Sequence, residues 1–407
     1  MINPVGAGAR SAGPAPGLVG GQPCKIAVIG TGGRAQAHLS TIPRLHDVYT
    51  LCAVCDLDPA RAEEVGGRFG VPGYTDVIEM LERERPDVAL IAVPPDGHHI
   101  LTVRCAERGV HVLCETPIAT TLPCADVMTA AAREHGIQLE IAENVWRFPI
   151  ERLKRRIIEA GLIGEVSQVH CWYTSGSYHG MNAVRTHVGS QAMRVVGYSR
   201  TFPTAPGGEP ADWELGLIDF ASGAMGVYQW PIRRERGNYW EIDGTRGQII
   251  GSELFLYNAD GKRVCYPLEA ETAEGPHGPT LVRMKVATDP PIVWENPYRD
   301  YGLSAGADDV ARADQLFSIY HAVVDGRPVQ YGAENARRDQ EILIALRESA
   351  STGSRPLALP LRAITAHEEA IHARYRERYG HDPLDVSEAA TRQLYPRRGV
   401  KQTVGGG

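Results

Sequence analysis

The chain has 407 residues, which is more than one hydrophobic core usually organises, so two domains with tails are expected. Hydrophobic residues make up 43% of the chain and charged residues 22%, as in an ordinary soluble globular protein. The formal net charge of −7, with no long run of Lys and Arg, excludes the basic surface of a nucleic-acid-binding protein. The expected partner is therefore a small molecule.

The first 23 residues predict a disordered tail, because a segment so rich in Gly, Ala and Pro cannot bury enough apolar surface to fold. They lack the basic start and apolar core of a signal peptide. No later stretch approaches the roughly 18 apolar residues of a membrane span. We therefore expect a cytoplasmic protein with no membrane contact.

Eight cysteines are scattered along the chain, and only Cys52 and Cys55 have the spacing of a CxxC pair. They lie in a predicted buried strand with no second pair to complete four zinc ligands, so no metal site is expected. A redox pair would need an exposed thiolate at the start of a helix. Buried free thiols in a reducing compartment are the expected state.

Residues 24–147 predict an α/β domain of the Rossmann type, with a doubly wound parallel sheet. Short apolar runs alternate there with helical patterns, which is typical of βαβ units. The expected strands are 25–29, 49–55, 88–93, 111–114 and 138–142. The expected helices are 34–45, 59–69, 76–85, 98–108 and 125–135.

Residues 148–362 predict an α+β domain with a large, mostly antiparallel open sheet. Its expected strands are 166–173, 213–220, 224–230, 239–243 and 248–257, and its expected helices are 151–160, 183–196, 311–324 and 333–350. Residues 258–307 are rich in Pro, Gly and charge and indicate an irregular excursion. Residues 363–407 indicate a C-terminal extension with one helix, 368–379, and a frayed tail. The sequence assigns this extension no role, and covering a neighbouring subunit or lying free are both open alternatives.

The sequence GTGGRA at residues 30–35 follows the first strand and opens the first helix, as a dinucleotide-binding turn does. Gly30 permits a tight turn, while Gly32 and Gly33 let backbone N–H groups approach a pyrophosphate. Arg34 belongs to the same loop, and the small Ala35 allows close packing of helix and strand. The helix N-terminus adds a favourable dipole.

Asp56 follows the second strand, 26 residues after Gly30, where a carboxylate accepts hydrogen bonds from the adenosine ribose. A 2′-phosphate would be repelled there, and the next residue, Leu57, is not basic. NAD is therefore favoured over NADP. The alternative at this point is an ordinary Gly-rich turn with Asp56 as a helix cap.

Three further segments carry a resemblance to a known family: VPPDGH at 93–98, VLCETP at 112–117 and IDGTRG at 242–247. With the loop above, the chain resembles the Gfo/Idh/MocA family of sugar and polyol oxidoreductases over residues 24–362. The resemblance implies homodimers or homotetramers formed through the open sheet. It also implies that Pro94 and His98 border the nicotinamide and that Glu115 and the next residues line the cleft where nicotinamide and substrate meet. For His98, a plain helix-starting histidine remains the alternative.

Two departures from the family pattern bear on catalysis. The family's Glu-Lys-Pro lysine, which helps remove the substrate proton, is replaced by Thr116. The family's Asp-x-x-x-His-x-x-Asp pattern, aligned on Gly197 as the helix end, places its histidine on His187, with Ala183 and Ser190 in place of the acids. A second registration uses His179 instead.

A neutral imidazole is well matched to proton transfer at neutral pH, whereas a threonine is not a base. His187 is therefore the first candidate for the catalytic base. Tyr178 and His179 are second candidates for a proton relay. A packed or exposed helix histidine is the alternative interpretation of His187.

By family geometry, several side chains would face the substrate: Thr116, Asn144, Trp146, Arg147, Asn182 and Arg185. Trp146 suits stacking on a sugar ring or packing between the domains. Arg147, Arg185 and Arg233 suit an anionic group of the substrate or ordinary ion pairs.

Three functions follow as hypotheses. The first is an NAD-dependent oxidoreductase acting on a hydroxyl of a sugar, glycoside or cyclitol. The second is a redox-neutral glycosidase or lyase that oxidises the sugar transiently, which Thr116 and the Thr186-His187 pair suggest. The third is a nucleotide-binding subunit without catalysis.

Overall fold

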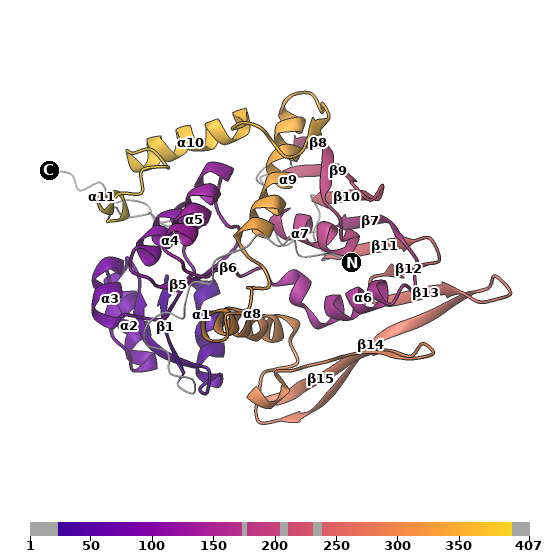
Figure 1. The fold of residues 1–407 in the computed structure, drawn as a ribbon, viewed down its shortest axis with the longest axis horizontal. Coiled ribbons are helices and arrows are strands. Elements are labelled where there is room, and N and C mark those ends of the chain that lie inside the picture. Colours follow the sequence, from indigo (N-terminus) through magenta and orange to yellow (C-terminus); the bar gives the residue numbers. More distant parts are fainter. Residues whose placement is uncertain (1–22, 173–176, 204–210, 231–237, 393–407) are drawn as a thin grey trace.

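The computed structural model describes residues 23–172, 177–203, 211–230 and 238–392. They form two domains side by side, each built on one sheet, with a C-terminal extension along the outside of the first domain (Figure 1). This arrangement confirms the predicted fold class. The predicted tail at the N-terminus lies outside the described residues, apart from its last residue.

The first sheet has six parallel strands in the order β3-β2-β1-β4-β5-β6. Their bounds are β1 Cys24–Ile29, β2 Tyr49–Cys55, β3 Gly73–Tyr74, β4 Val88–Ile91, β5 His111–Cys114 and β6 Leu139–Ile141. The chain reverses its direction of winding between β1 and β4. Ligands of open α/β sheets bind at such a switch point, beyond the carboxyl ends of the strands.

The helices of this domain begin close to where the sequence predicts them: α1 Gly33–Thr41, α2 Pro59–Phe69, α3 Val77–Glu84, α4 His98–Ala106 and α5 Leu122–Glu134. Asp58 caps α2 and Asp76 caps α3, each by accepting backbone N–H bonds. The helix predicted over 34–45 ends at Thr41 and continues as a 3₁₀ turn, Ile42–Arg44, because Pro43 cannot donate the next α-helical hydrogen bond.

One helix from the second half of the chain completes the first domain. α8, Ala307–Val324, places Leu316, Ile319 and Val323 in the same buried cluster as Ile26 and Leu39. The predicted boundary at residue 147 therefore assigns to the second domain a helix that covers one face of the Rossmann sheet. Through α8 the second half of the chain reaches the carboxyl edge of that sheet.

The second sheet has eleven strands, in the order β16-β15-β14-β13-β12-β11-β7-β10-β9-β8-β17. β7 and β10 pair in parallel, and the other pairings among the described strands are antiparallel. Their bounds are β7 Val166–Trp172, β8 Ala192–Phe202, β9 Ala211–Phe220, β10 Met225–Trp230, β11 Tyr239–Gly244, β12 Gly247–Ile250, β13 Glu253–Tyr257, β14 Arg263–Gly275, β15 Gly278–Val286, β16 Ile292–Glu295 and β17 Leu357–Ala358. The predicted open antiparallel sheet is confirmed.

The helix predicted over 183–196 is wrong in register. α7 spans Ser177–Val188 and ends at Gly189, whose φ of +67° suits glycine, and the following residues form β8. Gly197 does not end a helix. It lies in β8, where a Cβ would come within 1.8 Å of the Leu346 carbonyl oxygen on α9, so close packing of helix on sheet requires a glycine.

The predicted irregular excursion over 258–307 is also wrong, since β14, β15 and β16 lie within it. In β14 only Leu268 is buried, and the strand contains Pro267 and several glutamates, residue types that are depleted in strands. The strand predicted over 248–257 likewise divides into β12 and β13, with a turn at Gly251.

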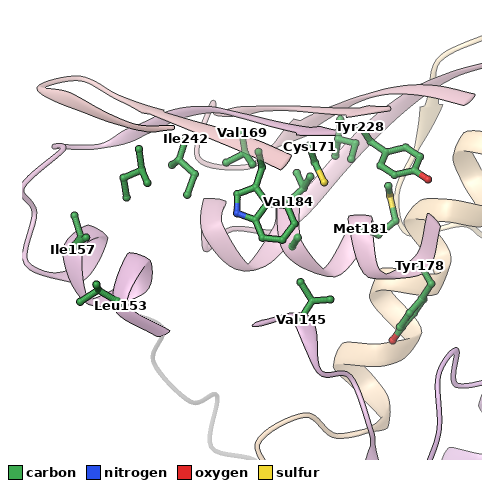
Figure 2. Close-up of a cluster of buried hydrophobic side chains, with 14 of the residues drawn as sticks. Val145, Leu153, Ile157, Val169, Cys171, Tyr178, Met181, Val184, Tyr228 and Ile242 are labelled. Carbon is green, nitrogen blue, oxygen red and sulfur yellow. The ribbon is translucent and has the colours of Figure 1, made fainter. Parts of the chain in front are cut away.

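α6 Pro149–Glu159, α7 and α9 Ala333–Ser351 cover one face of the large sheet. Figure 2 shows Val169, Cys171 and Ile242 pointing from the strands toward Val184 of α7 and Ile157 of α6. Tyr198 and Met225 are among the apolar side chains exposed elsewhere on the sheet. The sheet thus holds α7 rigidly by one side, and α7 carries all the candidate catalytic residues.

The C-terminal extension packs on its own chain. α10 Ala366–Tyr379 lies along α5 and α4, and a short helix, α11 Glu388–Thr391, follows it (Figure 1). The predicted helix is confirmed, and the described part of the extension, up to Arg392, packs on the first domain and does not lie free. None of the helices in the described part of the chain has both the length and the apolar character needed to span a membrane.

Candidate functional site

The glycine loop has the geometry of a dinucleotide turn. Gly30 has φ +88°, and a Cβ there would lie 2.5 Å from the Ala92 carbonyl oxygen of the neighbouring loop. A Cβ on Gly32 or Gly33 would meet nothing within 4 Å, so their backbone borders open space. Ala35 is fully buried at the helix–strand contact. The loop therefore leaves an accessible backbone cradle at the α1 N-terminus, which fits a pyrophosphate.

A cavity of about 500 Å³ runs past this loop. Gly30, Gly32, Gly33, Asp56 and Pro94 line it, as the sequence predicts for the cofactor site. It therefore reaches from the end of β2 to the loop after β4, and this path matches a dinucleotide laid across the switch point.

Asp56 is buried and faces this cavity. Its Oδ2 accepts hydrogen bonds from Thr31, from N at 2.9 Å and from Oγ1 at 2.6 Å, and its Oδ1 accepts one from Asp58 N at 3.0 Å. Asp58, not Asp56, caps α2. The helix-cap interpretation of Asp56 is thus replaced by a carboxylate that joins two loops at the adenosine end.

Arg34 turns away from the loop that carries it. Its Nε donates to Glu115 Oε1 at 2.8 Å and its Nη1 to Asp308 Oδ2 at 2.9 Å. His38 Nε2 lies 2.6 Å from the same Glu115 oxygen. Burial alone would raise the pKa of Glu115, but the hydrogen bond from His38 and the charge and hydrogen bond of Arg34 lower it to about 2. Glu115 is therefore a carboxylate anion at neutral pH.

Asp308 joins this group from α8, in whose first turn an acidic side chain is favoured. Asn144 Nδ2 donates to Asp308 Oδ1 at 2.6 Å, and Arg312 pairs with the other oxygen. Burial raises the pKa of Asp308, but the charge of Arg34 and the Asn144 hydrogen bond outweigh it and lower the pKa. Asn144 thus lies among the charged side chains of Arg34, Asp308 and Arg312.

His179 points into the same region. Its Nδ1 lies 2.8 and 2.9 Å from the two carboxylate oxygens of Glu143, which is fully buried and also accepts from Val145 N at 2.9 Å. Burial alone would lower the pKa of His179, but the charge of Glu143 and its hydrogen bond raise it, and the charges of Glu115 and Arg34 also act on the ring. The side chain keeps 21% exposure. We call Arg34, Glu115, Glu143, Asn144, His179 and Asp308 the interdomain cluster.

His187 lies elsewhere. Its Nε2 is 2.9 Å from Glu151 on α6, its ring lies 6.1 Å from that of Trp240 on β11, and its side chain is 2% exposed. Burial lowers the pKa of His187, so the ring is neutral at neutral pH. Because the helix ends at Gly189 rather than Gly197, the predicted registration on His187 is displaced. With the family histidine on His179, the second acid of the pattern falls on Asn182.

Tyr178, Asn182 and Arg185 recur at helical spacing on α7 and face α9. Arg185 binds Asp339 through Nε and through Nη2 at 3.1 Å, and Asn182 Nδ2 donates to the same carboxylate at 3.1 Å. The Tyr178 hydroxyl lies 2.9 Å from that of Tyr331, which also reaches Asp339. Burial raises the pKa of Tyr178. These three candidates form a buried network that docks α7 on α9.

Trp146 and Arg147 do not face the interdomain cluster. Arg147 is buried and pairs with Asp314 at 2.7 Å and with Glu140. The guanidinium carbons of Arg147 and Arg152 lie 4.7 and 4.2 Å from the Trp146 ring centre. The packing interpretation therefore fits both residues. Arg233 lies outside the described residues.

Pro94, His98 and Thr116 border the site in different ways. Pro94 lines the cavity, while His98 is fully buried with its two ring nitrogens each 2.9 Å from a carbonyl oxygen, those of Val93 and Pro117. Burial lowers the pKa of His98. His98 therefore ties together the loops after β4 and β5. Thr116 is partly exposed beside Glu115.

Three residues of the site were absent from the sequence prediction: His38, Glu143 and Asp308. His38 stands four residues after Arg34 on one helix, and Glu143 follows the last Rossmann strand at the carboxyl edge, so a local signal existed for both. Asp308 lies between the segment predicted to be irregular, 258–307, and the helix predicted over 311–324, and nothing local pointed to it. In the described parts of the chain, no three His, Cys, Asp or Glu side chains gather closely enough to hold a metal ion.

A glycine cradle, a buried carboxylate at the end of β2 and a cavity that runs past both are the features of a dinucleotide-binding protein. The sequence model of the Gfo/Idh/MocA oxidoreductase family, an NAD-binding Rossmann fold, matches residues 24–143. Residues 24–143 therefore form an NAD-binding domain similar to that of the Gfo/Idh/MocA oxidoreductases.

Two curated relatives match part of the chain. Inositol 2-dehydrogenase 1 of Saccharopolyspora erythraea is 28% identical over 219 residues, 49% of this chain and 64% of that protein. Levoglucosan dehydrogenase of Pseudarthrobacter phenanthrenivorans is 28% identical over 247 residues, 48% of this chain and 63% of that protein. The matched part of the chain spans less than two thirds of each relative.

Solved structures match more of the chain. An NAD binding oxidoreductase from Klebsiella pneumoniae has a TM-score of 0.67 at 21% identity, covering 83% of this chain and 100% of that one. Levoglucosan dehydrogenase in complex with NADH and levoglucosan has a TM-score of 0.67 at 22% identity, covering 84% and 100%. These similarities establish that the two-domain fold is shared.

Proposed function

We propose that the protein oxidises a hydroxyl of an uncharged sugar, glycoside or cyclitol, with NAD as the hydride acceptor and His179 as the base. The observation that carries the proposal is the His179–Glu143 pair, which lies beside ionised Glu115 where the two domains meet. The names of the two curated relatives support this substrate class, since they act on inositol and levoglucosan.

NAD, when bound, supplies the electrophilic ring that accepts a hydride from the carbon bearing the hydroxyl. The protein must remove the hydroxyl proton. Glu143 accepts the Nδ1–H of His179, which orients the ring and leaves Nε2 as the atom that takes the proton. The Glu143 carboxylate then stabilises the imidazolium. This pair supplies the base that Thr116 cannot be.

The charges at the site favour a neutral substrate. Arg147 is buried against two carboxylates, Arg185 is held by Asp339, and Arg34 is held by Glu115 and Asp308. The described arginines predicted to bind an anionic group are thus already paired. A polyol, which needs only hydrogen bonds, fits the remaining donors and acceptors.

We further propose a cytoplasmic homodimer or homotetramer formed through the large sheet, with no nucleic-acid partner. The apolar side chains exposed on the sheet, such as Tyr198 and Met225, support this assembly. Sedimentation analysis tests it: a monomer at micromolar concentration would contradict it.

The activity is tested by mixing protein, NAD and a panel of neutral polyols, including myo-inositol and levoglucosan, and following NADH absorbance. We expect net NADH formation with at least one polyol and none with matched sugar acids. The redox-neutral alternative predicts cleavage of an aryl glycoside with no net NADH, and that result would overturn the proposal. Binding of NAD without turnover of any polyol or glycoside would favour a non-catalytic subunit.

A further inference from the structure

The end of the C-terminal extension lies at the cofactor cavity. Thr391 and Arg392 line the cavity of about 500 Å³, together with Asp56, Leu57 and Asp76 at its adenosine end. We propose that the extension is part of the NAD site and that Arg392 binds the adenosine half of the dinucleotide. This inference rests on the NAD site described above. It adds to that site two residues of the C-terminal extension, Thr391 and Arg392, which lie outside the Rossmann domain.

The extension is fixed where it begins. Glu368 Oε1 accepts the backbone N–H of Leu122, the first residue of α5, at 2.8 Å, and His372 Nε2 lies 2.9 Å from Thr121 Oγ1. Glu368 and His372 are both buried. Buried polar groups with partners hold one geometry, since losing a partner leaves an unpaired group out of water. α10 is therefore docked on the Rossmann domain.

The segment after α10 is fixed along α4. His99 Nε2 lies 2.6 Å from the Pro383 carbonyl oxygen, Arg104 Nη2 donates to the Val386 carbonyl oxygen at 2.5 Å, and Arg108 Nη2 reaches Glu388 at 3.1 Å. The three donors stand on α4 or just after it. From Pro383 to Glu388 the extension therefore follows α4 from its N-terminal to its C-terminal end, and α11 lies beside α4 (Figure 1).

The last described residue, Arg392, reaches the rim of the cavity. Its Nη1 lies 3.7 Å from Asp76 Oδ2, and Asp76 is itself fixed because its Oδ1 accepts from Ile78 N at 2.8 Å. The Arg392 side chain keeps 56% exposure, so the planar guanidinium remains accessible beside the cavity. A guanidinium stacks on aromatic faces, and the purine ring is the aromatic part of the cofactor at this end.

The adenosine end of the cavity is identified by the strands that precede its lining residues. Asp56 and Leu57 follow β2, and Asp76 caps α3 after β3, whereas the residues assigned to the nicotinamide side follow β4 and β5. Arg392 contacts Asp76 on the β2–β3 side. An arginine there contributes to the binding of the adenosine half and not to hydride transfer.

The test compares binding of 5′-AMP and NAD by calorimetry in the full-length protein, in Arg392→Ala, and in a chain ending at residue 387. Arg374→Ala is the matched control, because Arg374 is an exposed arginine of α10 that does not line the cavity. Thermal unfolding of each variant checks that the fold is kept. We expect Arg392→Ala and the shortened chain to bind AMP about fivefold more weakly or worse, as loss of one stacking cation predicts, with Arg374→Ala unchanged.

Unchanged AMP affinity in Arg392→Ala and in the shortened chain, with wild type binding AMP normally, would overturn this inference and leave the NAD site standing. A wild-type protein that binds neither AMP nor NAD would overturn the NAD site as well. An equal loss in Arg374→Ala would also contradict the assignment, since it would indicate a general charge effect.

Discussion

Two histidines on one helix show how surroundings decide function. His179 and His187 stand eight residues apart on α7, and each lies within 3 Å of a glutamate. His179 meets the other domain, keeps partial exposure and has a raised pKa because Glu143 outweighs burial. His187 meets the sheet and α6, is closed off, and has a pKa lowered by burial. The first has the access that catalysis requires, and the second is part of the core.

The largest expected effect is on turnover. We expect His179→Ala to lower kcat/KM for a polyol by about 10² to 10⁴, the usual contribution of a positioned general base. Affinity for NAD should stay within about twofold of wild type, because the adenosine and pyrophosphate contacts are untouched. Steady-state NADH formation and calorimetry measure the two quantities. Turnover near that of wild type would remove His179 from the mechanism.

The opposite result is expected for His187. His187→Ala should lower the free energy of unfolding by about 2–3 kcal/mol, because it leaves a cavity and takes a partner from buried Glu151. Its kcat per folded molecule should remain close to wild type. Urea unfolding measures the loss, with His321→Ala, at 35% side-chain exposure, as the control for removing a histidine. A large fall in kcat with unchanged stability would show that His187 acts in turnover and not in the core.

These expectations show how far the sequence alone reaches. The Rossmann strands, the glycine loop and Asp56 were predictable because each depends on local pattern: an apolar run, a turn residue, a carboxylate after a strand. The helix end assumed at Gly197, on which the choice of His187 over His179 rested, was wrong. From its neighbours in sequence, Gly197 resembles the end of a helix. In the structure a glycine is needed there because a Cβ would collide with the carbonyl oxygen of Leu346 on α9, a residue distant in sequence.

Other errors have the same origin. β14 is mostly exposed and carries Pro267 and several glutamates, so its composition does not mark it as a strand. Arg147 and Arg185 look like anion-binding residues until Asp314 and Asp339, far along the chain, are seen to pair with them. Predictions failed where the partner was remote in sequence, and such partners decide which polar side chains remain available to a ligand.

A smaller effect concerns the pH dependence of turnover. His179 must be neutral to accept a proton, so activity falls as the pH drops through its raised pKa. Glu143→Gln removes the carboxylate that raises this pKa, so the acid limb of the kcat/KM profile should move to lower pH by about one unit. Rates measured from pH 5 to 9 test this. An unchanged acid limb in Glu143→Gln would show that Glu143 does not raise the pKa that controls turnover.

The smallest effect concerns stability and pH. The pKa of His187 is lower in the folded chain than in the unfolded chain, so its contribution is present above about pH 6.5 and lost as the pH falls. Between pH 7 and pH 5 the free energy of unfolding of wild type should therefore fall more steeply than that of His187→Ala. Denaturant titrations at several pH values measure both slopes. Equal slopes would show that His187 does not titrate on unfolding.

The most direct test of the central claim is a crystal structure of the protein with NAD and a polyol that supports turnover. The assignment of His179 as the base predicts a substrate hydroxyl oxygen within about 3 Å of His179 Nε2, with the bound carbon facing the nicotinamide and His187 still closed off beside Glu151. A substrate hydroxyl bound away from His179, or in contact with His187, would contradict it.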